Sequence, residues 1–156
     1  MPSLTLSNNL SKAANTKRAQ MIINEPFSNA TSDDDWTGYN SALVSHTTAG
    51  SKYMTTQTSG GGNGGAYLEF SCIPNSEYKV TAVLYTILGG GTDDARVKIG
   101  TSGNNASIGN HVASRSGATI SQDFSVGNRT SFFISLHTDG ASATAYWDSL
   151  KIEETG

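Results

Sequence analysis

The chain has 156 residues, which suits one domain with a single sizeable core. Its residues are 15% charged and 36% hydrophobic and include 17 glycines, a mixture that argues against a helical bundle or a disordered chain and favours an all-β domain. The formal net charge is −3, but residues 1–24 hold three cations and no acid, so the remainder carries −6 by subtraction of +3. This acidic body excludes the basic face that a nucleic-acid-binding domain needs.

The first twenty residues, MPSLTLSNNLSKAANTKRAQ, have little apolar content and no convincing period. We expect an extended N-terminal arm, residues 1–20, that gains order against another molecule, because it buries too little to offset its own conformational entropy. The alternative is a frayed terminus. As an arm, its leucines would fill apolar grooves and its cations would meet an acidic surface. The predicted contact residues are Leu4, Leu6, Leu10, Lys12, Lys17 and Arg18.

Short strand-like stretches with turn signals between them follow the arm. In chain order they cover residues 21–23, 42–45, 52–58, 66–73, 78–88, 95–99, 119–126, 131–137 and 143–153. The stretch 66–73 alternates apolar and polar residues, and 78–88 is apolar enough on both faces to be a central strand. No stretch repeats its apolar residues with the period of an amphipathic helix. The sequence therefore predicts a jelly-roll β-sandwich of two antiparallel sheets over residues 21–156.

Nucleotide, zinc and catalytic motifs lack their required context. Residues 60–65, GGGNGG, match G-x-G-x-x-G but precede a strand-like stretch, whereas dinucleotide binding requires a helix there. His46, His111 and His137 fall on separate predicted elements, so they are not expected to bind zinc together. Cys72 lies in an alternating strand pattern and is expected to be a buried, unreactive thiol. No G-x-S-x-G elbow is present, so an enzyme is not expected.

The chain shows no membrane-spanning or signal sequence. No apolar run approaches transmembrane length, and the first residues lack the apolar segment of a signal peptide. We therefore expect neither a membrane partner nor secretion by a signal peptide.

Aromatic residues that could face solvent are the main candidates for ligand binding. A glycan site needs two or three aromatic rings on one surface with polar neighbours, because sugar rings stack on aromatic faces. Tyr39, Tyr53 and Tyr67 are the candidate platform, whereas Trp36 is expected to pack at one end of the sandwich.

Three segments resemble carbohydrate-binding modules of families 4, 9 and 22. INEPFSNATSDDDW, residues 23–36, resembles the opening of those modules, where an Asn, a Phe and a later Trp begin the jelly roll. PNSEYKVTAVLY resembles their mid-chain turn, and AYWDSLKIEE resembles their closing strand. The resemblance spans residues 21–154 and implies a galactose-binding-like jelly roll. It leaves the ligand open, because this fold carries many functions.

In those modules the closing Asp commonly holds the last strand to the opening segment, often through a structural calcium. The resemblance implies this role for Asp148, with Asn24 as a second calcium ligand. Strict alternation places Asp148 on the core side with Leu150 and Ile152, and Trp147 on the opposite face. We therefore expect Trp147 to point outward, towards the arm or another chain.

The arm segment LTLSNNLSKA resembles the short leaders of tailed-phage virion proteins. This resemblance implies a non-enzymatic capsid decoration (cement) protein that clamps shell subunits through its arm and β-sandwich. Such a protein would be made in the host cytoplasm and located in the virion. Its partners would be the major capsid protein or other virion subunits. A homo-oligomer is expected, and a trimer would fit the symmetry sites of shells. The alternative is a carbohydrate-binding module that recognises a polysaccharide or a receptor glycan, for example on a phage tail.

Overall fold

The structure is a computed structural model. It describes residues 20–25, 27, 35–40, 43–47, 53–57, 63–89, 94–113, 117–140 and 143–156. Within these ranges every regular element is a β-strand, and no helix that could cross a membrane occurs among them.

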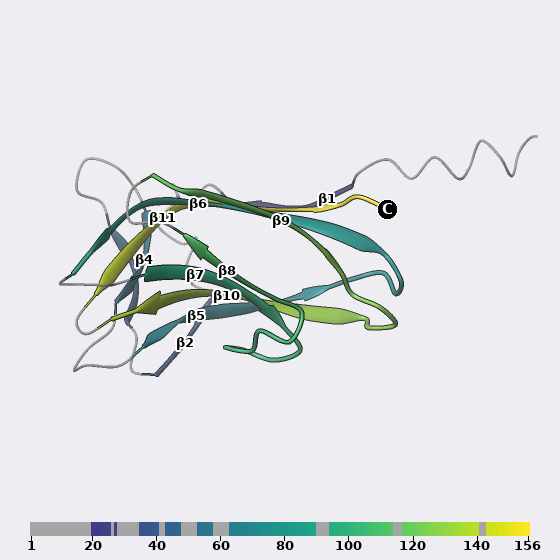
Figure 1. Cartoon of the computed structure of the whole chain (residues 1–156), viewed down its shortest axis with the longest axis horizontal. Coiled ribbons are helices and arrows are strands. Elements are labelled where there is room, and N and C mark those ends of the chain that lie inside the picture. Colours follow the sequence, from purple (N-terminus) through teal and green to yellow (C-terminus); the bar gives the residue numbers. More distant parts are fainter. Residues whose placement is uncertain are drawn as a thin grey trace, which may run out of the picture.

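Two antiparallel sheets lie on top of each other as the layers of a sandwich (Figure 1). Sheet A has the order β3–β4–β11–β6–β9, with β1 also paired to β11, and sheet B has the order β2–β5–β10–β7–β8. The strands of sheet A are β1 (Gln20–Glu25), β3 (Leu43–Thr47), β4 (Tyr53–Gln57), β6 (Glu77–Leu88), β9 (Thr119–Ser125) and β11 (Thr144–Glu154). Those of sheet B are β2 (Thr37–Tyr39), β5 (Gly64–Ser71), β7 (Asp94–Gly100), β8 (Gly109–Ala113) and β10 (Ser131–Asp139). The predicted two-sheet jelly-roll sandwich is confirmed.

The core lies between the sheets and is rich in aromatic rings. Phe132 of β10 is fully buried, and its ring centroid lies 5.1 Å from Phe124, 5.6 Å from Tyr78 and 5.7 Å from Phe70. Burying each such side chain contributes about 1.5–3 kcal/mol relative to leaving it exposed. The alternating apolar residues of these strands therefore account for the stacking of the two sheets.

Trp147 contradicts the prediction that it points outward, because its side chain is 0% exposed. The pairing of β11 with β6 shifts register twice, and these shifts leave Tyr85 of β6 and Asp148 of β11 as extra residues. Such a bulge moves the alternation by one position. Trp147 therefore shares the core side with Leu150 and Ile152, and Asp148 does not.

The buried indole takes part in a polar link between the sheets. Trp147 Nε1 donates a hydrogen bond to Thr56 Oγ1 at 3.1 Å, and that hydroxyl lies 2.7 Å from the Thr138 hydroxyl of β10. Thr138 also donates to the carbonyl of Thr56 at 3.1 Å. All three side chains are buried, so this link satisfies polar groups that would otherwise destabilise the core.

The prediction that Trp36 packs inside the sandwich is confirmed, whereas Cys72 is less buried than predicted. Trp36 is buried and packs edge-on against Phe27, with ring centroids 6.0 Å apart, as expected of a side chain that packs inside the sandwich. Cys72 is half-buried, and burial raises the pKa of its thiol, which disfavours the reactive thiolate.

Nine strands were predicted close to their observed positions, but β2 and β8 were missed. Both are edge strands of sheet B, and their sequences TGY and GNHVA contain glycine or asparagine, which are rare in strands. The predicted arm lies outside the described residues, apart from Gln20 at the start of β1.

Candidate functional site

The outer face of sheet B gathers polar and aromatic side chains into one row. Strand register places Tyr39, Gly65, His137, Arg96 and Val112 opposite one another on the five strands of the sheet. Neighbouring strands lie about 4.8 Å apart, so this cross-strand row is roughly 19 Å long. A ligand longer than one sugar ring could therefore contact several strands at once.

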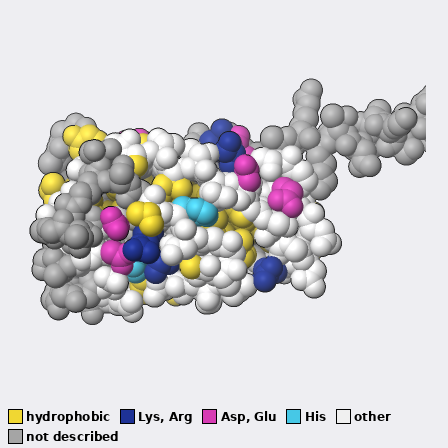
Figure 2. Space-filling model, in the orientation of Figure 1, with side chains coloured by type: hydrophobic (Ala, Val, Ile, Leu, Met, Phe, Trp, Pro, Cys, Tyr) yellow, Lys and Arg dark blue, Asp and Glu magenta, His cyan; other side chains and the backbone are white. Residues whose placement is uncertain are grey.

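A continuous chain of polar contacts runs along this row. Tyr39 Oη lies 2.7 Å from His137 Nδ1, and His137 Nε2 lies 3.0 Å from Asp139 Oδ1. The other carboxylate oxygen of Asp139 forms an ion pair with Arg96 Nε, and Asp94 lies 3.9 Å from the same guanidinium. Figure 2 shows basic and acidic side chains lying against each other on the surface of the molecule.

The contacts define the protonation states of Tyr39 and His137. Because the Asp139 carboxylate only accepts, His137 Nε2 donates to it, and Nδ1 accepts from the Tyr39 hydroxyl. Burial and the neighbouring Lys98 ammonium lower the pKa of His137, and burial and the Asp139 carboxylate raise the pKa of the Tyr39 hydroxyl. Both side chains are therefore neutral near pH 7, and their hydrogen bonds hold them in one orientation.

Gly65 makes the contact between Tyr39 and His137 possible. A Cβ atom at this position would lie 2.8 Å from Tyr39 Oη and 2.9 Å from the Cα of His137, and it would collide with the carbonyl of Leu136. Because Gly65 has no side chain, the Tyr39 side chain can pass over β5 and reach His137 on β10. The site therefore depends on glycine at position 65.

Two of the three tyrosines predicted as a glycan platform lie together. Tyr39 and Tyr67 have ring centroids 6.1 Å apart, and the Tyr67 ring meets Phe133 edge-on at 5.9 Å. Tyr39 and Tyr67 are both half-buried, so each keeps part of its surface open. Tyr53 lies on β4 of sheet A, and so it does not belong to this face.

The loop between β7 and β8 covers the outer face beside the row. The backbone N–H of Asn104 donates to Ser135 Oγ at 2.9 Å, and Lys98 Nζ donates to Asn104 Oδ1 at 2.9 Å. Gly103 packs so closely on the Tyr67 ring that a side chain there would collide with it. This loop closes the Tyr67 side of the row.

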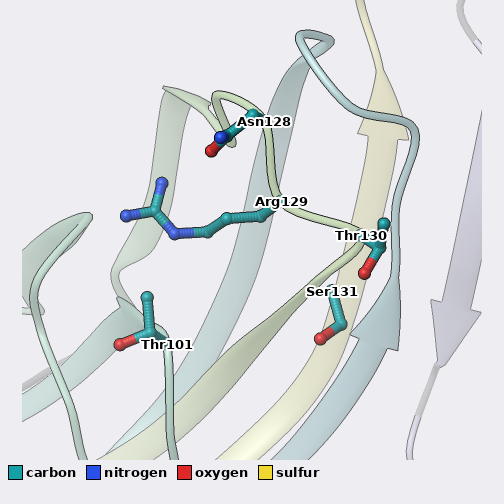
Figure 3. A pocket seen from close by; sticks show the side chains of 5 residues that line it. All are labelled: Thr101, Asn128, Arg129, Thr130 and Ser131. Carbon is teal, nitrogen blue, oxygen red and sulfur yellow. The ribbon is translucent and has the colours of Figure 1, made fainter.

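A separate depression of about 330 Å³ lies between the start of this loop and the turn from β9 to β10 (Figure 3). Its lining residues are Thr101, Asn128, Arg129, Thr130 and Ser131. Arg129 extends across it, with its guanidinium between Asn128 and Thr101. Arg129 Nη1 donates to the carbonyl of Val126 at 2.9 Å, which fixes the side chain in this position. We call this hollow the Arg129 depression.

The predicted calcium ligands lie on neighbouring strands. β1 pairs with β11, so the opening segment is held to the closing strand, and Asn24 pairs with Lys151, three residues from Asp148. Calcium takes about six to eight oxygen ligands. No group of three or more His, Cys, Asp or Glu side chains occurs among the described residues, and calcium binding by Asn24 and Asp148 stays a prediction.

The predicted partner-binding residues fall into two groups. Trp147 is buried and cannot contact another chain. The arm residues Leu4, Leu6, Leu10, Lys12, Lys17 and Arg18 lie outside the described residues.

Sequence reasoning missed His137, Arg96 and Asp139 as members of the site. Alternation along β10 does place Phe133, Ser135, His137 and Asp139 on one face, and that signal was present in the sequence. Arg96 joins them only through the pairing of β10 with β7.

No protein-family model matches the chain, and no curated protein sequence matches it. Several solved structures, by contrast, match the fold of the chain. The CBM22-1 xylan-binding domain of Xyn10C from Paenibacillus barcinonensis matches with a TM-score of 0.67 and 15% identity over 89% of this chain and 97% of that one. The mannan-recognising carbohydrate-binding module TmCBM27 matches with a TM-score of 0.56 and 10% identity over 89% and 99%.

A phage protein is also similar in structure. The enzymatically active domain of tailspike protein 4 from bacteriophage CBA120 matches with a TM-score of 0.54 and 11% identity over 81% of this chain. The match covers 20% of that chain, so it concerns one part of the tailspike. The protein thus has the jelly-roll fold that carbohydrate-binding modules also have.

Proposed function

We propose that the protein is a non-catalytic carbohydrate-binding module that holds a polysaccharide along the cross-strand row. The observation that carries this proposal is the chain of contacts from Tyr39 through His137 and Asp139 to Arg96, on an outer sheet face next to Tyr67. Aromatic rings pack on the apolar faces of sugars, and fixed polar groups hydrogen-bond to sugar hydroxyls.

The charges of the row favour a neutral glycan. The Arg96 guanidinium lies between two carboxylates, Asp94 and Asp139, so it can donate hydrogen bonds without presenting net positive charge. The carboxylates can accept hydrogen bonds from sugar hydroxyls at the same place. Because the contacts within the row hold these side chains in position, binding would cost little ordering entropy.

The similar structures support this function over capsid decoration. Two of them are named for xylan and mannan recognition, and both are binding modules. The tailspike match is compatible with a phage origin but gives no support for a shell-clamping role. Capsid decoration, homo-oligomer formation and a virion location stay as predictions from the arm sequence.

Isothermal titration with soluble xylan and mannan tests the proposal. Tyr39→Ala should weaken binding of whichever glycan binds by about tenfold or more, since truncating a well-packed aromatic contact at a binding surface commonly costs that much affinity. Tyr85→Ala is the matched control, because Tyr85 is an exposed tyrosine on sheet A, and it should leave affinity unchanged. Circular dichroism would show that both variants are folded.

Two outcomes would contradict the proposal. One is that the wild-type protein binds no member of a broad neutral glycan array. The other is that Tyr39→Ala and Tyr85→Ala bind the same glycan equally well while both remain folded.

A further inference from the structure

Arg96 in the cross-strand row and Arg129 in the depression differ in how their charge is balanced. Arg96 pairs with Asp139 and lies near Asp94. Arg129 has no carboxylate within ion-pair distance among the residues that the structure describes, and its guanidinium donates to the neutral carbonyl of Val126. Its positive charge is therefore not balanced by a described neighbour.

The surroundings of Arg129 are suited to an anionic group. The guanidinium keeps N–H groups in addition to the one that meets Val126, and a planar guanidinium matches the two oxygens of a carboxylate or sulfate. The hydroxyls of Thr101, Thr130 and Ser131 and the amide of Asn128 line the same hollow (Figure 3). None of the lining residues is acidic, so nothing in the lining repels an anion.

The depression lies where β10 begins, whereas the cross-strand row crosses β10 near its other end. Ser131 and His137 both lie on the outer side of β10, six residues apart, which corresponds to about 20 Å along a strand. The loop between β7 and β8 lies between them, because Asn104 is bonded to Ser135. The cross-strand row and the Arg129 depression are therefore separate sites.

We infer that the Arg129 depression binds the oxyanion of an acidic saccharide, either the carboxylate of a uronic acid or a sulfate ester. Arg129 pairs with the oxyanion, and the neighbouring hydroxyls contact its remaining oxygens and the sugar. The saccharide part of this inference rests on the proposed function, whereas the anionic part rests on the depression alone. A glycan with neutral and acidic units could occupy the row with the former and the depression with the latter.

NMR titration of the ¹⁵N-labelled full chain tests the inference with four probes: glucuronate, glucose 6-sulfate, glucose and inorganic sulfate. We expect saturable shifts of the backbone amides of Thr101 and of residues 128–131 with one or both acidic sugars, and weaker shifts with glucose. Added NaCl should weaken these shifts, because the contact is exposed and screened by salt. The relative affinities of glucuronate and glucose 6-sulfate identify the preferred oxyanion.

Variants separate this site from the row and from general charge effects. Arg129→Gln should weaken acidic-sugar binding by about tenfold, since it removes a charge-assisted contact. Arg129→Lys should lose less affinity, because it keeps the charge without the planar fork. Lys79→Gln, which removes the same charge from sheet A, should bind as the wild type does. Neutral glycan binding at the row should be unchanged in Arg129→Gln.

The inference fails if Arg129→Gln binds the acidic sugars as tightly as Lys79→Gln does, or if glucose shifts the same amides with equal affinity. Inorganic sulfate binding as tightly as both acidic sugars would overturn the saccharide assignment. Failure of the proposed function looks different: neutral glycans would then leave the amides of Arg96 and His137 unshifted, whatever occurs around Arg129.

Discussion

The outer sides of β6 in sheet A and β10 in sheet B differ more than their similar inner sides suggest. Both strands turn alternating apolar residues to the core. On the outer side of β6, Tyr85 is 55% exposed, whereas on the outer side of β10 Ser135 is 0% and His137 is 3% exposed. Ser135 and His137 thus face away from the core and are still buried, by neighbouring side chains and by the loop between β7 and β8. Contacts with other protein groups, not only with solvent, hold these side chains in position. This difference distinguishes the candidate site from the outer face of sheet A.

The largest effect should come from truncating the buried histidine on the outer side of β10. His137→Ala removes a buried ring and leaves the Tyr39 hydroxyl and the Asp139 carboxylate without this partner. We expect a loss of about 3 kcal/mol in the free energy of unfolding, measured by urea denaturation. Thr81→Ala, on the outer side of β6, should change it by less than about 0.5 kcal/mol. Equal losses in both variants would remove the distinction between the two faces.

A smaller effect is expected where a side chain is added beneath the site. Gly65→Ala places a methyl group against the Leu136 carbonyl and the Tyr39 hydroxyl. Overpacking of this kind destabilises by about 1–3 kcal/mol, and displacement of Tyr39 should also weaken glycan binding. Thermal unfolding and glycan titration of the same variant measure the two effects. A matched substitution, Gly117→Ala, has open space for its methyl group but a positive φ, so it should cost stability through the backbone without affecting binding.

The smallest effect concerns pH and the same histidine. The pKa of His137 is lowered in the fold, mainly by burial, whereas an unfolded histidine titrates near about 6.5. As pH falls below about 6.5, the unfolded chain takes up a proton before the folded chain does, so the free energy of unfolding decreases. This part of the stability is complete above that pH and is lost progressively below it.

Urea denaturation of wild type and His137→Gln between pH 8 and pH 5 checks this. The pKa of His111 is also lowered by burial, but His111 is present in both proteins, so its contribution cancels in the difference. The variant should lose less stability than the wild type on acidification. Parallel pH profiles would show that His137 does not titrate differently in the two states.

Hydrophobic alternation within single strands predicts most of the fold, whereas contacts between strands that are distant in the sequence cannot be predicted from it. Alternation places the strands of the core well, because each strand carries its own pattern. The bulge at Asp148 inverts the predicted direction of Trp147, since the extra residue is defined by the partner strand β6 and not by β11 alone. Edge strand β2 is three residues long and carries too little pattern to be recognised.

The candidate site is predicted only in part for the same reason. Tyr39 and Tyr67 are recognisable as ring-bearing residues, but the sequence does not indicate which tyrosines share a face. The contact between Tyr39 and His137 joins residues 98 positions apart, and it exists because β5 lies between β2 and β10 with a glycine at the crossing. Such a contact follows from sheet order, which no single stretch of the chain encodes.

The hydrogen bonds among Trp147, Thr56 and Thr138 have a consequence for how the two layers can move. Apolar attraction is non-directional, whereas the hydrogen bond between two hydroxyls at 2.7 Å weakens steeply when its distance or angle changes. Thr138 lies between His137 and Asp139 along β10. These three consecutive residues therefore contact Thr56 of sheet A on the core side, through Thr138, and form part of the candidate binding face on the outer side. Sliding of one layer over the other would therefore displace both site residues, and the buried link resists that sliding.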